Sequence, residues 1–189
     1  MYRVSFVDKW RRWMDDEDAE LADLFDDRPS AVMEIGTAFH KAVELAPPGD
    51  HAVLEANGCR FEIPDDFEID AGKFLELRAS KTYVVDGQPI VISGQVDSLD
   101  GLTIDDHKTT ARFDPERYLS GFQWRLYLDI FEADRFRWNV FEIEEVDQDT
   151  FRVRAAHRLE QFRYPGLAED CQRLVADFAR FMRTVERPA

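Results

Sequence analysis

The stretch PIVISGQVDSLDGLTIDDHKTT, residues 89–110, decides how we expect the chain to fold. Its two apolar runs are separated by Asp100-Gly101, a dipeptide that favours a tight hairpin turn between two strands. Alternate side chains of a strand share a face, so the pattern places Asp106 and Lys108 together at the end of the second strand. Asp97, near the end of the first strand, is expected to join them across the hairpin. Two carboxylates and a lysine in this arrangement indicate a site that binds a metal ion and activates water.

The length of the chain favours a single domain. Its 189 residues are enough for one sizeable core. We expect one domain over residues 1–189, with an N-terminal helical segment 1–30, a core 31–165 and a C-terminal helix 166–186. No apolar run approaches the roughly 20 residues that a membrane helix needs, and the N-terminus lacks the pattern of a signal peptide. The sequence therefore predicts a cytoplasmic protein with no membrane contact.

The two cysteines limit the metal chemistry that the chain can support. Cys59 and Cys171 are far apart in the sequence and form no CxxC pair. Two thiols cannot supply a four-thiolate zinc or iron–sulfur site. In a reducing compartment we expect buried free thiols rather than a disulfide.

The acidic charge of the chain argues against tight, nonspecific binding of nucleic acid. The net charge is −15, and phosphate contacts require lysine and arginine. The acidity is uneven, because residues 1–107 hold 10 basic and 24 acidic side chains whereas residues 108–189 hold 14 and 15. The second half can therefore still present a local face lined with arginine.

Helical patterns occur at both ends of the chain and on either side of the opening stretch. Residues 2–27 predict two short helical segments, or one helix and a loop. Ser30 can cap a helix that runs to residue 45, residues 115–131 have helical spacing, and residues 167–185 predict a closing amphipathic helix. The helix that Ser30 caps carries Gly36, His40 and Glu44, which recur every four positions and so lie along one face.

Strand patterns fill the remaining segments. Asn57-Gly58 predicts a hairpin within residues 53–63, and Asp86-Gly87 predicts a turn that leads into the opening stretch. Two further strands are expected over residues 136–146 and 151–162, while the pattern of residues 69–79 fits either a short helix or a strand. Helices and strands in this order predict an α/β or α+β fold with a sheet flanked by helices.

Four segments in order resemble the motifs of the PD-(D/E)XK nuclease superfamily, in particular its RecB-type branch, which includes CRISPR-associated adaptation exonucleases. The segments are GTAFHKAVE at 36–44, GQVDSL at 94–99, IDDHKTT at 104–110 and QWRLY at 123–127. The resemblance spans residues 31–145, and the ordered set is much more specific than any one motif. It implies a restriction-endonuclease-like mixed sheet flanked by helices, and a metal-dependent phosphodiesterase.

The resemblance also implies a role for each polar residue of the site. Asp97 and Asp106 would bind Mg²⁺ or Mn²⁺, with the backbone carbonyl of His107 and the imidazole of His40 as further ligands. Carboxylate oxygens suit both cations, whereas an imidazole ligand suits Mn²⁺ better. Lys108 would orient or help deprotonate the attacking water and stabilise the negative charge of the transition state.

The helix after the opening stretch supplies the remaining candidates. By the resemblance, Gln123 and Tyr127 would position the phosphate or the lysine through hydrogen bonds. Arg112, Arg117 and Arg125 are near enough in sequence to contact the substrate backbone. Trp124, on the same helix as Gln123, could stack on a base.

Several features depart from the family pattern or leave two interpretations open. His107 occupies a position that is usually apolar, so its side chain is either exposed or directed into a polar layer. Too few cysteines are present for the iron–sulfur cluster that one branch of the family carries. No helicase motif occurs either. A helicase or recombination protein would therefore supply a DNA end, unless this protein approaches the end directly. Glu44 is either a carboxylate that supports a ligand or an exposed acid. Asp105 is expected to face solvent, with binding of water or a second metal as the alternative.

Two classes of function follow. The first is a DNA nuclease, expected to act as an exonuclease on ends or single strands in recombination, repair or phage DNA metabolism in a bacterial or phage-infected cell; a restriction-type endonuclease is the other enzyme of this class. The second is a non-enzymatic accessory protein that retains the nuclease fold and binds a basic partner, which the charge of −15 favours. The sequence leaves open the polarity, DNA or RNA preference, metal number and oligomeric state.

Overall fold

A computed structural model describes residues 1–47, 51–64 and 77–185. Within these residues no helix is long and apolar enough to cross a membrane. The elements, in chain order, are β1 (Tyr2–Arg3), α1 (Val4–Met14), α2 (Leu21–Phe25), α3 (Ala31–Leu45), β2 (Val53–Ala56), β3 (Cys59–Glu62), β4 (Leu77–Val85), β5 (Gln88–Val96), β6 (Ser98–Asp100), β7 (Thr103–Thr110), α4 (Pro115–Leu119), α5 (Gln123–Ile130), β8 (Arg135–Asp147), β9 (Thr150–Phe162) and α6 (Leu167–Thr184).

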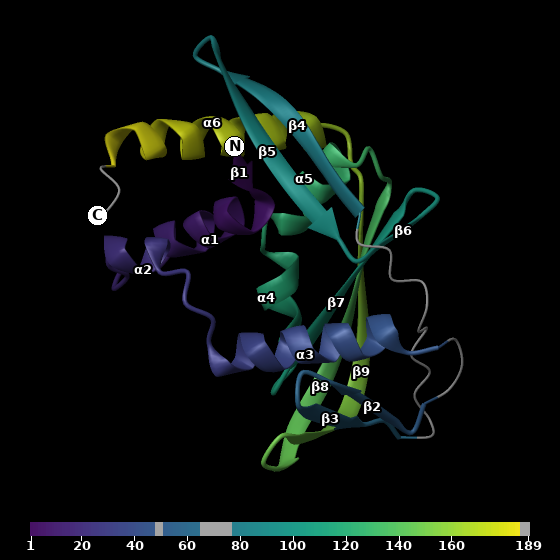
Figure 1. Cartoon of the computed structure of the whole chain (residues 1–189). Coiled ribbons are helices and arrows are strands. Elements are labelled where there is room, and N and C mark those ends of the chain that lie inside the picture. The colour runs from purple at the N-terminus through teal and green to yellow at the C-terminus, as the bar shows by residue number, and fades with distance from the viewer. Residues whose placement is uncertain (48–50, 65–76, 186–189) are drawn as a thin grey trace.

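The described strands form two mixed sheets (Figure 1). The larger sheet has six strands in the order β2-β3-β9-β8-β7-β6, with β7 parallel to β8 and β3 parallel to β9. The smaller sheet has the order β1-β5-β4, with β1 parallel to β5 and β4 antiparallel to it. Mixed sheets with flanking helices confirm the predicted α+β class.

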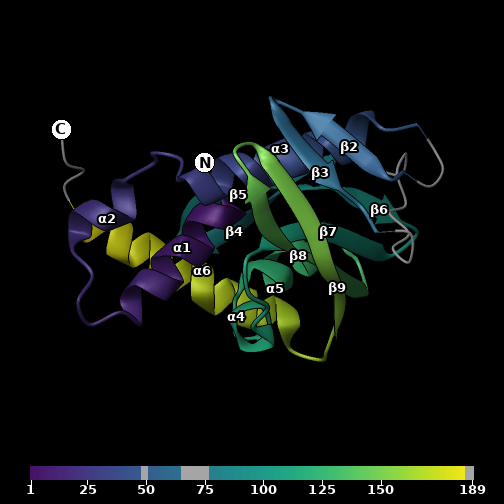
Figure 2. The ribbon, with the colours of Figure 1, turned by 90° about the horizontal axis from the view of Figure 1, so that it is seen from below.

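Helices lie over both faces of the larger sheet (Figure 2), and an apolar cluster fills the space on each side. On one face, buried side chains of β7 and β8, such as Ile104 and Phe136, pack with the smaller sheet and with α1, α5 and α6. On the other face, Phe141 and Val153 pack with Phe39 of α3. The larger sheet, which contains β7, therefore lies between α3 on one side and a layer formed by α1, α5 and α6 on the other.

The tight turns occur where the dipeptides predict them. Asn57 and Gly58 have φ of 51° and 83°, and Asp86 and Gly87 have φ of 52° and 75°. Left-handed backbone at both central positions is the geometry of the hairpin turn that suits the twist of antiparallel strands. These turns join β2 to β3 and β4 to β5, as expected.

The opening stretch folds differently from the predicted hairpin. The turn lies one residue later than predicted, at Gly101 and Leu102, because Asp100 is the last residue of β6 and pairs with Thr103. It joins the short strand β6 to β7, whereas β5 pairs with β4 in the smaller sheet. The physical reason is local: β4 and β5 are both nine residues long, and a two-residue turn closes their pairing at little cost in chain entropy. Asp97 consequently lies at the junction between the two sheets.

One of the helical expectations was wrong in detail and another is confirmed. Residues 115–131 form two helices, α4 and α5, rather than one, because the helical backbone is interrupted between Leu119 and Gln123. At the N-terminus, α1 and α2 match the two expected helical segments, but β1 precedes them. Of the undecided segment 69–79, residues 77–79 belong to β4 and the rest lies outside the described residues.

Two helices agree with the sequence interpretation. Ser30 caps α3 by accepting a hydrogen bond from the backbone N–H of Met33. The closing helix α6 begins at Leu167, and its buried residues Cys171 and Phe178 lie on the expected apolar side. These two helices pack against opposite faces of the larger sheet.

Candidate active site

Strand β7 brings an acid and a lysine to the edge of the apolar core. Asp106 and Lys108 share the face of Ile104, and Asp105 and His107 share the opposite face, as alternation requires. The Nζ atom of Lys108 lies 2.9 Å from Oδ1 and 2.7 Å from Oδ2 of Asp106. Asp106 is 4% exposed and Lys108 is half-buried, so the carboxylate is shielded from solvent more fully than the lysine side chain.

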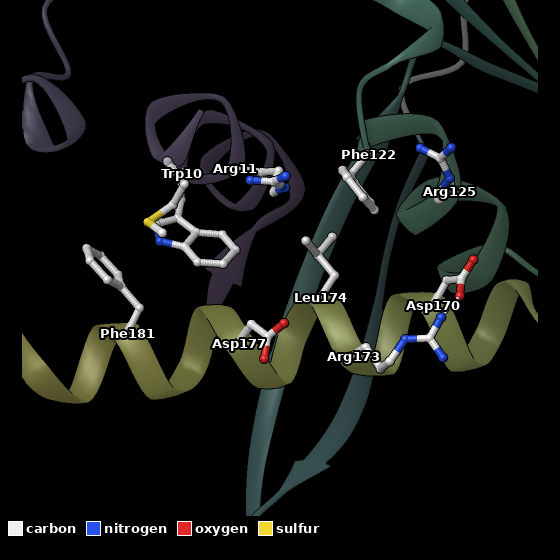
Figure 3. Close-up of a pocket in the computed structure, with 10 residues that line it drawn as sticks. Trp10, Arg11, Phe122, Arg125, Asp170, Arg173, Leu174, Asp177 and Phe181 are labelled. Carbon is white, nitrogen blue, oxygen red and sulfur yellow. Dashed lines mark hydrogen bonds and ion pairs between the residues drawn. The ribbon is translucent and has the colours of Figure 1, made fainter. Parts of the chain in front are cut away.

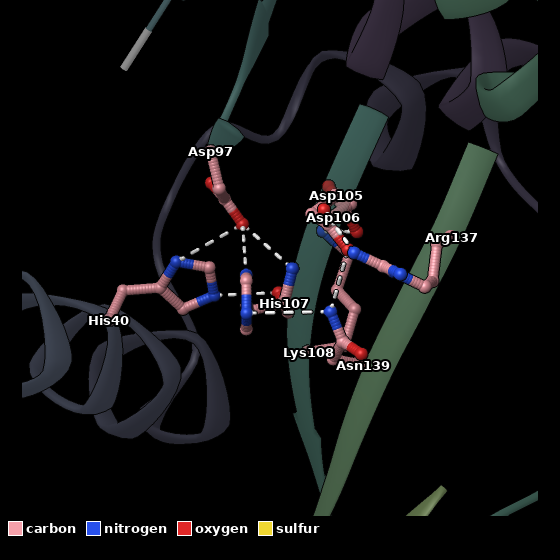
Figure 4. A network of polar contacts seen from close by, with 8 residues as sticks. All are labelled: His40, Asp97, Asp105, Asp106, His107, Lys108, Arg137 and Asn139. Atoms are coloured by element: carbon pink, nitrogen blue, oxygen red, sulfur yellow. Dashed lines mark hydrogen bonds and ion pairs between the residues drawn. The ribbon is translucent and has the colours of Figure 1, made fainter. Parts of the chain in front are cut away.

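Asp97 links the two sheets to this strand (Figure 4). Its Oδ2 atom accepts a hydrogen bond of 2.7 Å from the backbone N–H of His107. The same atom lies 3.6 Å from Nδ1 of His40 and 3.5 Å from Nδ1 of His107. Burial raises the pKa of Asp97, but the hydrogen bonds from His107 and the charges of His40 and Lys108 outweigh it and lower this pKa to about 2.

The helix α3 delivers His40 to the same point. Nε2 of His40 lies 2.6 Å from the backbone carbonyl oxygen of His107, so in this arrangement Nε2 carries a proton and donates it. The approach of α3 to β7 depends on Gly36, because a Cβ there would lie 3.2 Å from Oγ1 of Thr109. The absence of a side chain at Gly36 thus makes room for the side chain of Thr109 on β7.

Burial and charge set opposite demands on Asp106 and Lys108. Burial raises the pKa of Asp106, and the negative charge of Asp97 adds to it, against the attraction of Lys108. Burial alone would lower the pKa of Lys108, but the charges of Asp106 and Asp97 outweigh it and raise this pKa above its ordinary value. Lys108 is therefore an ammonium ion at neutral pH, which favours charge stabilisation over proton abstraction.

The first two turns of α5 place Gln123 and Tyr127 next to this pair. Burial and then the charge of Asp106 raise the pKa of Tyr127 to about 12, against a smaller lowering by the nearby Gln123 side chain. The Tyr127 ring stacks on Phe136 with centroids 5.8 Å apart. A neutral phenol is thus held beside the acid and the lysine.

The structure corrects the expectation that Asp105 faces solvent. Asp105 is 7% exposed and forms an ion pair with Arg137 and a 3.1 Å hydrogen bond from Asn139 (Figure 4). The cause is the parallel register of β7 and β8, which sets Arg137 directly beside Asp105. This arginine satisfies the carboxylate and leaves it unsuited to a second metal.

Glu44 stands away from the candidate ligands. It is exposed and pairs with Lys41 at 2.8 Å. Of its two interpretations, the exposed acid is therefore correct.

The residues proposed for substrate contact divide into two groups. Arg112 and Arg117 are exposed just beyond β7 and on α4. Trp124 is 3% exposed, and the guanidinium of Arg125 lies 4.4 Å from its ring centroid, so the expected base stacking on Trp124 has no accessible face. Arg125 instead lines a cavity of about 620 Å³ between α1, α5 and α6 (Figure 3).

Tyr118 and Asn139 are polar neighbours of the site that the sequence patterns did not reveal. Tyr118 of α4 is close enough to Thr110 and Lys108 for both to affect its pKa, which burial raises. Asn139 of β8 contacts both Asp105 and the ring of His107. Neither residue carries a local signal, since both reach the site only through the pairing of β8 and the break before α5.

Among the described residues, the candidate ligands do not form a preorganised metal site. Within the described residues, no group of three or more His, Cys, Asp or Glu side chains has the geometry of a metal site. Asp106 Oδ2 is nevertheless buried and, among the described residues, has no hydrogen bond, only its charge contact with Lys108. An oxygen in this state can accept a hard cation.

Comparisons with known proteins leave the function open. No protein-family model and no curated protein matches the chain. One solved structure, described as the crystal structure of SSO0001, aligns with a TM-score of 0.45 and 16% identity over 56% of this chain. The aligned region spans about half of that protein, at 48%. A likeness this weak carries no argument.

Proposed function

We propose that the protein is a metal-dependent nuclease that hydrolyses phosphodiester bonds. The observation that carries this proposal is the convergence of His40, Asp97, Asp106 and Lys108 from α3, the β5–β6 junction and β7. Carboxylates, an imidazole and a lysine at one sheet edge suit hydrolysis of a phosphate ester. The ordered motifs that resemble PD-(D/E)XK nucleases support the same activity.

The donor set fits a divalent cation. Asp97, Asp106 and the carbonyl of His107 would bind Mg²⁺ or Mn²⁺. Among the described residues, Oδ2 of Asp106 has a charge contact with Lys108 but no hydrogen bond, so it can still accept a cation. His40 would join them after its Nε2 releases the carbonyl of His107. A cation held there would neutralise the scissile phosphate and lower the pKa of a bound water.

The protein side chains would then manage charge and orientation. In hydrolysis a water oxygen forms a new bond to phosphorus while the bond from phosphorus to the leaving oxygen breaks. The Lys108 ammonium would stabilise the negative charge that builds on the phosphate oxygens. Gln123 and Tyr127 would hold the phosphate or Lys108 by hydrogen bonds, as neutral donors that remain protonated at working pH.

The test is cleavage of end-labelled linear DNA with Mn²⁺ or Mg²⁺, stopped by EDTA. We expect Lys108→Met and Asp106→Asn each to abolish cleavage. These substitutions keep the approximate size of each side chain, although each removes one charge of the buried pair, so both variants must also be shown to fold. Exposed controls are Lys41→Ala and Glu44→Gln, which should cleave like the wild type.

Cleavage that survives unchanged in both Lys108→Met and Asp106→Asn would disprove this mechanism. Covalently closed circular DNA separates the two enzyme readings, because an exonuclease spares it and an endonuclease cuts it. Single- and double-stranded DNA and RNA in the same assay define the substrate and polarity.

Free thiols at both cysteines suit our expectation that the enzyme works in the cytoplasm, with a helicase or recombination protein as a source of ends.

A second candidate function is binding of a basic partner without catalysis. The net charge of −15 favours it, because this charge repels a polyanion and attracts a cationic surface. A stoichiometric basic partner, together with no cleavage of any nucleic acid tested, would support this function over the first.

A further inference from the structure

Asp8 of α1 closes the beginning of α5 from a distance of more than a hundred residues in sequence. Its Oδ1 atom accepts hydrogen bonds from the backbone N–H groups of Phe122 and Gln123, at 2.9 Å and 3.1 Å. Asp8 is 6% exposed, and its Oδ2 atom pairs with Arg12 at 3.0 Å. One oxygen therefore holds α5 while the other is held by its own helix.

The start of α5 requires such a partner. The first N–H groups of a helix have no acceptor within the helix, and the side chain of Phe122, which stands at the N-cap, cannot supply one. A negative charge at this end also agrees with the helix dipole. Gly121 leaves room for the carboxylate, because a Cβ there would lie 3.3 Å from Asp8 Oδ1. This contact coincides with the break between α4 and α5.

The held end of α5 is also the end that carries the candidate catalytic residues. Gln123 is the first residue of the helix, and its side chain lies close enough to Tyr127, one turn later, to affect the pKa of that phenol. Tyr127 lies close enough to Asp106 and Lys108 for their charges to act on it. A shift of the first turn would therefore move both side chains relative to the acid and the lysine.

We propose that Asp8 is a positioning residue for the candidate active site: its carboxylate fixes the start of α5 and so places Gln123 and Tyr127 against Asp106 and Lys108. This inference rests on the proposed nuclease function for its kinetic consequence. Its structural part concerns the amide groups of α5 and can be measured without any substrate.

The kinetic test compares Asp8→Ala with Asp8→Asn. Asparagine keeps the Oδ1 acceptor and alanine removes it, so we expect Asp8→Asn to retain most of the activity. For Asp8→Ala we expect kcat to fall by about tenfold to a hundredfold with little change in KM, the size of effect that a displaced catalytic group produces. The matched control is Asp86→Ala, which removes an exposed carboxylate that pairs with Arg180 and Arg183 and should leave kcat unchanged.

Two further measurements separate positioning from a general loss of stability. In a Tyr127→Phe background, Asp8→Ala should lower kcat by less than it does in the wild type, because the two residues act in one path. Amide hydrogen exchange should speed up at Phe122 and Gln123 in Asp8→Ala and not in Asp86→Ala. If Asp8→Ala fails to fold, Gly121→Ala displaces the same carboxylate from the other side and should also lower kcat.

The outcomes divide cleanly. A wild-type protein that cleaves no nucleic acid overturns the nuclease proposal, while faster exchange at the two amides still upholds the structural role of Asp8. A folded Asp8→Ala protein with wild-type kcat and wild-type exchange overturns the inference and leaves the nuclease proposal standing. Equal loss of activity in Asp8→Ala and Asp86→Ala also overturns it.

Discussion

One carboxylate oxygen of Asp97 serves three neighbours at the candidate site. It accepts from the His107 backbone and lies near the imidazoles of His40 and His107. Since the pKa of Asp97 is lowered to about 2, the carboxylate remains ionised throughout the neutral range. Its charge is thus available both to a cation and to Lys108, whose pKa it helps to raise. The polar residues of this region depend on one another for their charge states.

The two thiols differ in a way that chemistry can measure. Cys171 has no exposed surface, and burial together with the charge of Asp129 raises its pKa to about 12. Cys59 is only half-buried, and burial raises the pKa of its thiol less than it raises that of Cys171. Because the thiolate is the reactive species, we expect an alkylating reagent at pH 8 to modify Cys59 first and Cys171 only after denaturation. Mass spectrometry of the native protein checks the order, and early modification of Cys171 would contradict it.

Tyr83 gives the protein a limit at alkaline pH. It is 3% exposed, and burial, the hydrogen bond to Asp129 and the charge of Asp129 all raise its pKa above 10.0. A group whose pKa is raised on folding contributes stability below its unfolded pKa and loses it as pH rises. We expect the free energy of unfolding to fall above about pH 10 and to fall less steeply in Tyr83→Phe.

Urea unfolding of both proteins from pH 7 to 11 measures this difference. At pH 7 the Tyr83→Phe protein should be less stable by about 1 kcal/mol, the usual net value of one hydrogen bond. Parallel pH profiles for the two proteins would show that Tyr83 does not set the alkaline limit.

Residue patterns predicted side-chain direction better than they predicted partners. Alternation along β7 correctly placed Asp106 with Lys108, because the period of a strand is a local property. The environment of Asp105 depended on Arg137, which reaches it only through the parallel register of β8. That register is fixed by packing between distant segments, so the sequence pattern could not show that Asp105 is buried and paired.

At the scale of elements, the turns were predictable and the sheets were not. Asp86-Gly87 turns the chain as its composition requires, and the turn predicted at Asp100-Gly101 lies one residue later, at Gly101 and Leu102. β5 joins a separate sheet because its nine-residue pairing with β4 replaces the expected pairing with the following strand, a competition between two neighbouring turns that the local patterns did not decide. Likewise, helical spacing over residues 115–131 identified α4 and α5, but their separation coincides with the carboxylate of Asp8.

The approach of α5 to β5 leads to a prediction at this scale. A Cβ on Gly94 would lie 2.6 Å and 2.9 Å from two carbons of the Tyr127 ring, which is buried and cannot easily move. We expect Gly94→Ala to lower the free energy of unfolding by about 1–3 kcal/mol, as overpacked cores do, and to reduce cleavage because Tyr127 shifts. Urea unfolding and the DNA assay measure both effects.

The control is Gln95→Ala, a change at the exposed neighbouring position of the same strand. It should leave stability within about 0.5 kcal/mol of the wild type. Wild-type stability in Gly94→Ala would mean that the backbone of β5 moves away from α5 without cost.

At the scale of the whole molecule, the charge of −15 conflicts with a polyanionic substrate. The conflict is eased where the chain is closest to neutral, since residues 108–189 hold nearly equal numbers of basic and acidic side chains. Within that half, Arg112 and Arg117 are exposed next to the end of β7, whereas Arg125 faces the cavity between α1, α5 and α6. Substrate affinity should therefore depend on a few local contacts rather than on the overall field.

This arrangement predicts a shallow salt dependence. Each phosphate neutralised by a side chain contributes a slope of about −0.9 to the logarithm of affinity against the logarithm of salt concentration for duplex DNA. With Arg112 and Arg117 as the contacts, we expect a total slope of about −2, measured by DNA binding in Ca²⁺ between 50 and 200 mM salt. Arg112→Ala and Arg117→Ala should each make the slope shallower by about 1. Arg125→Ala should leave the slope unchanged, and a steep slope that depends on Arg125 would place the DNA on the face of α1, α5 and α6 instead.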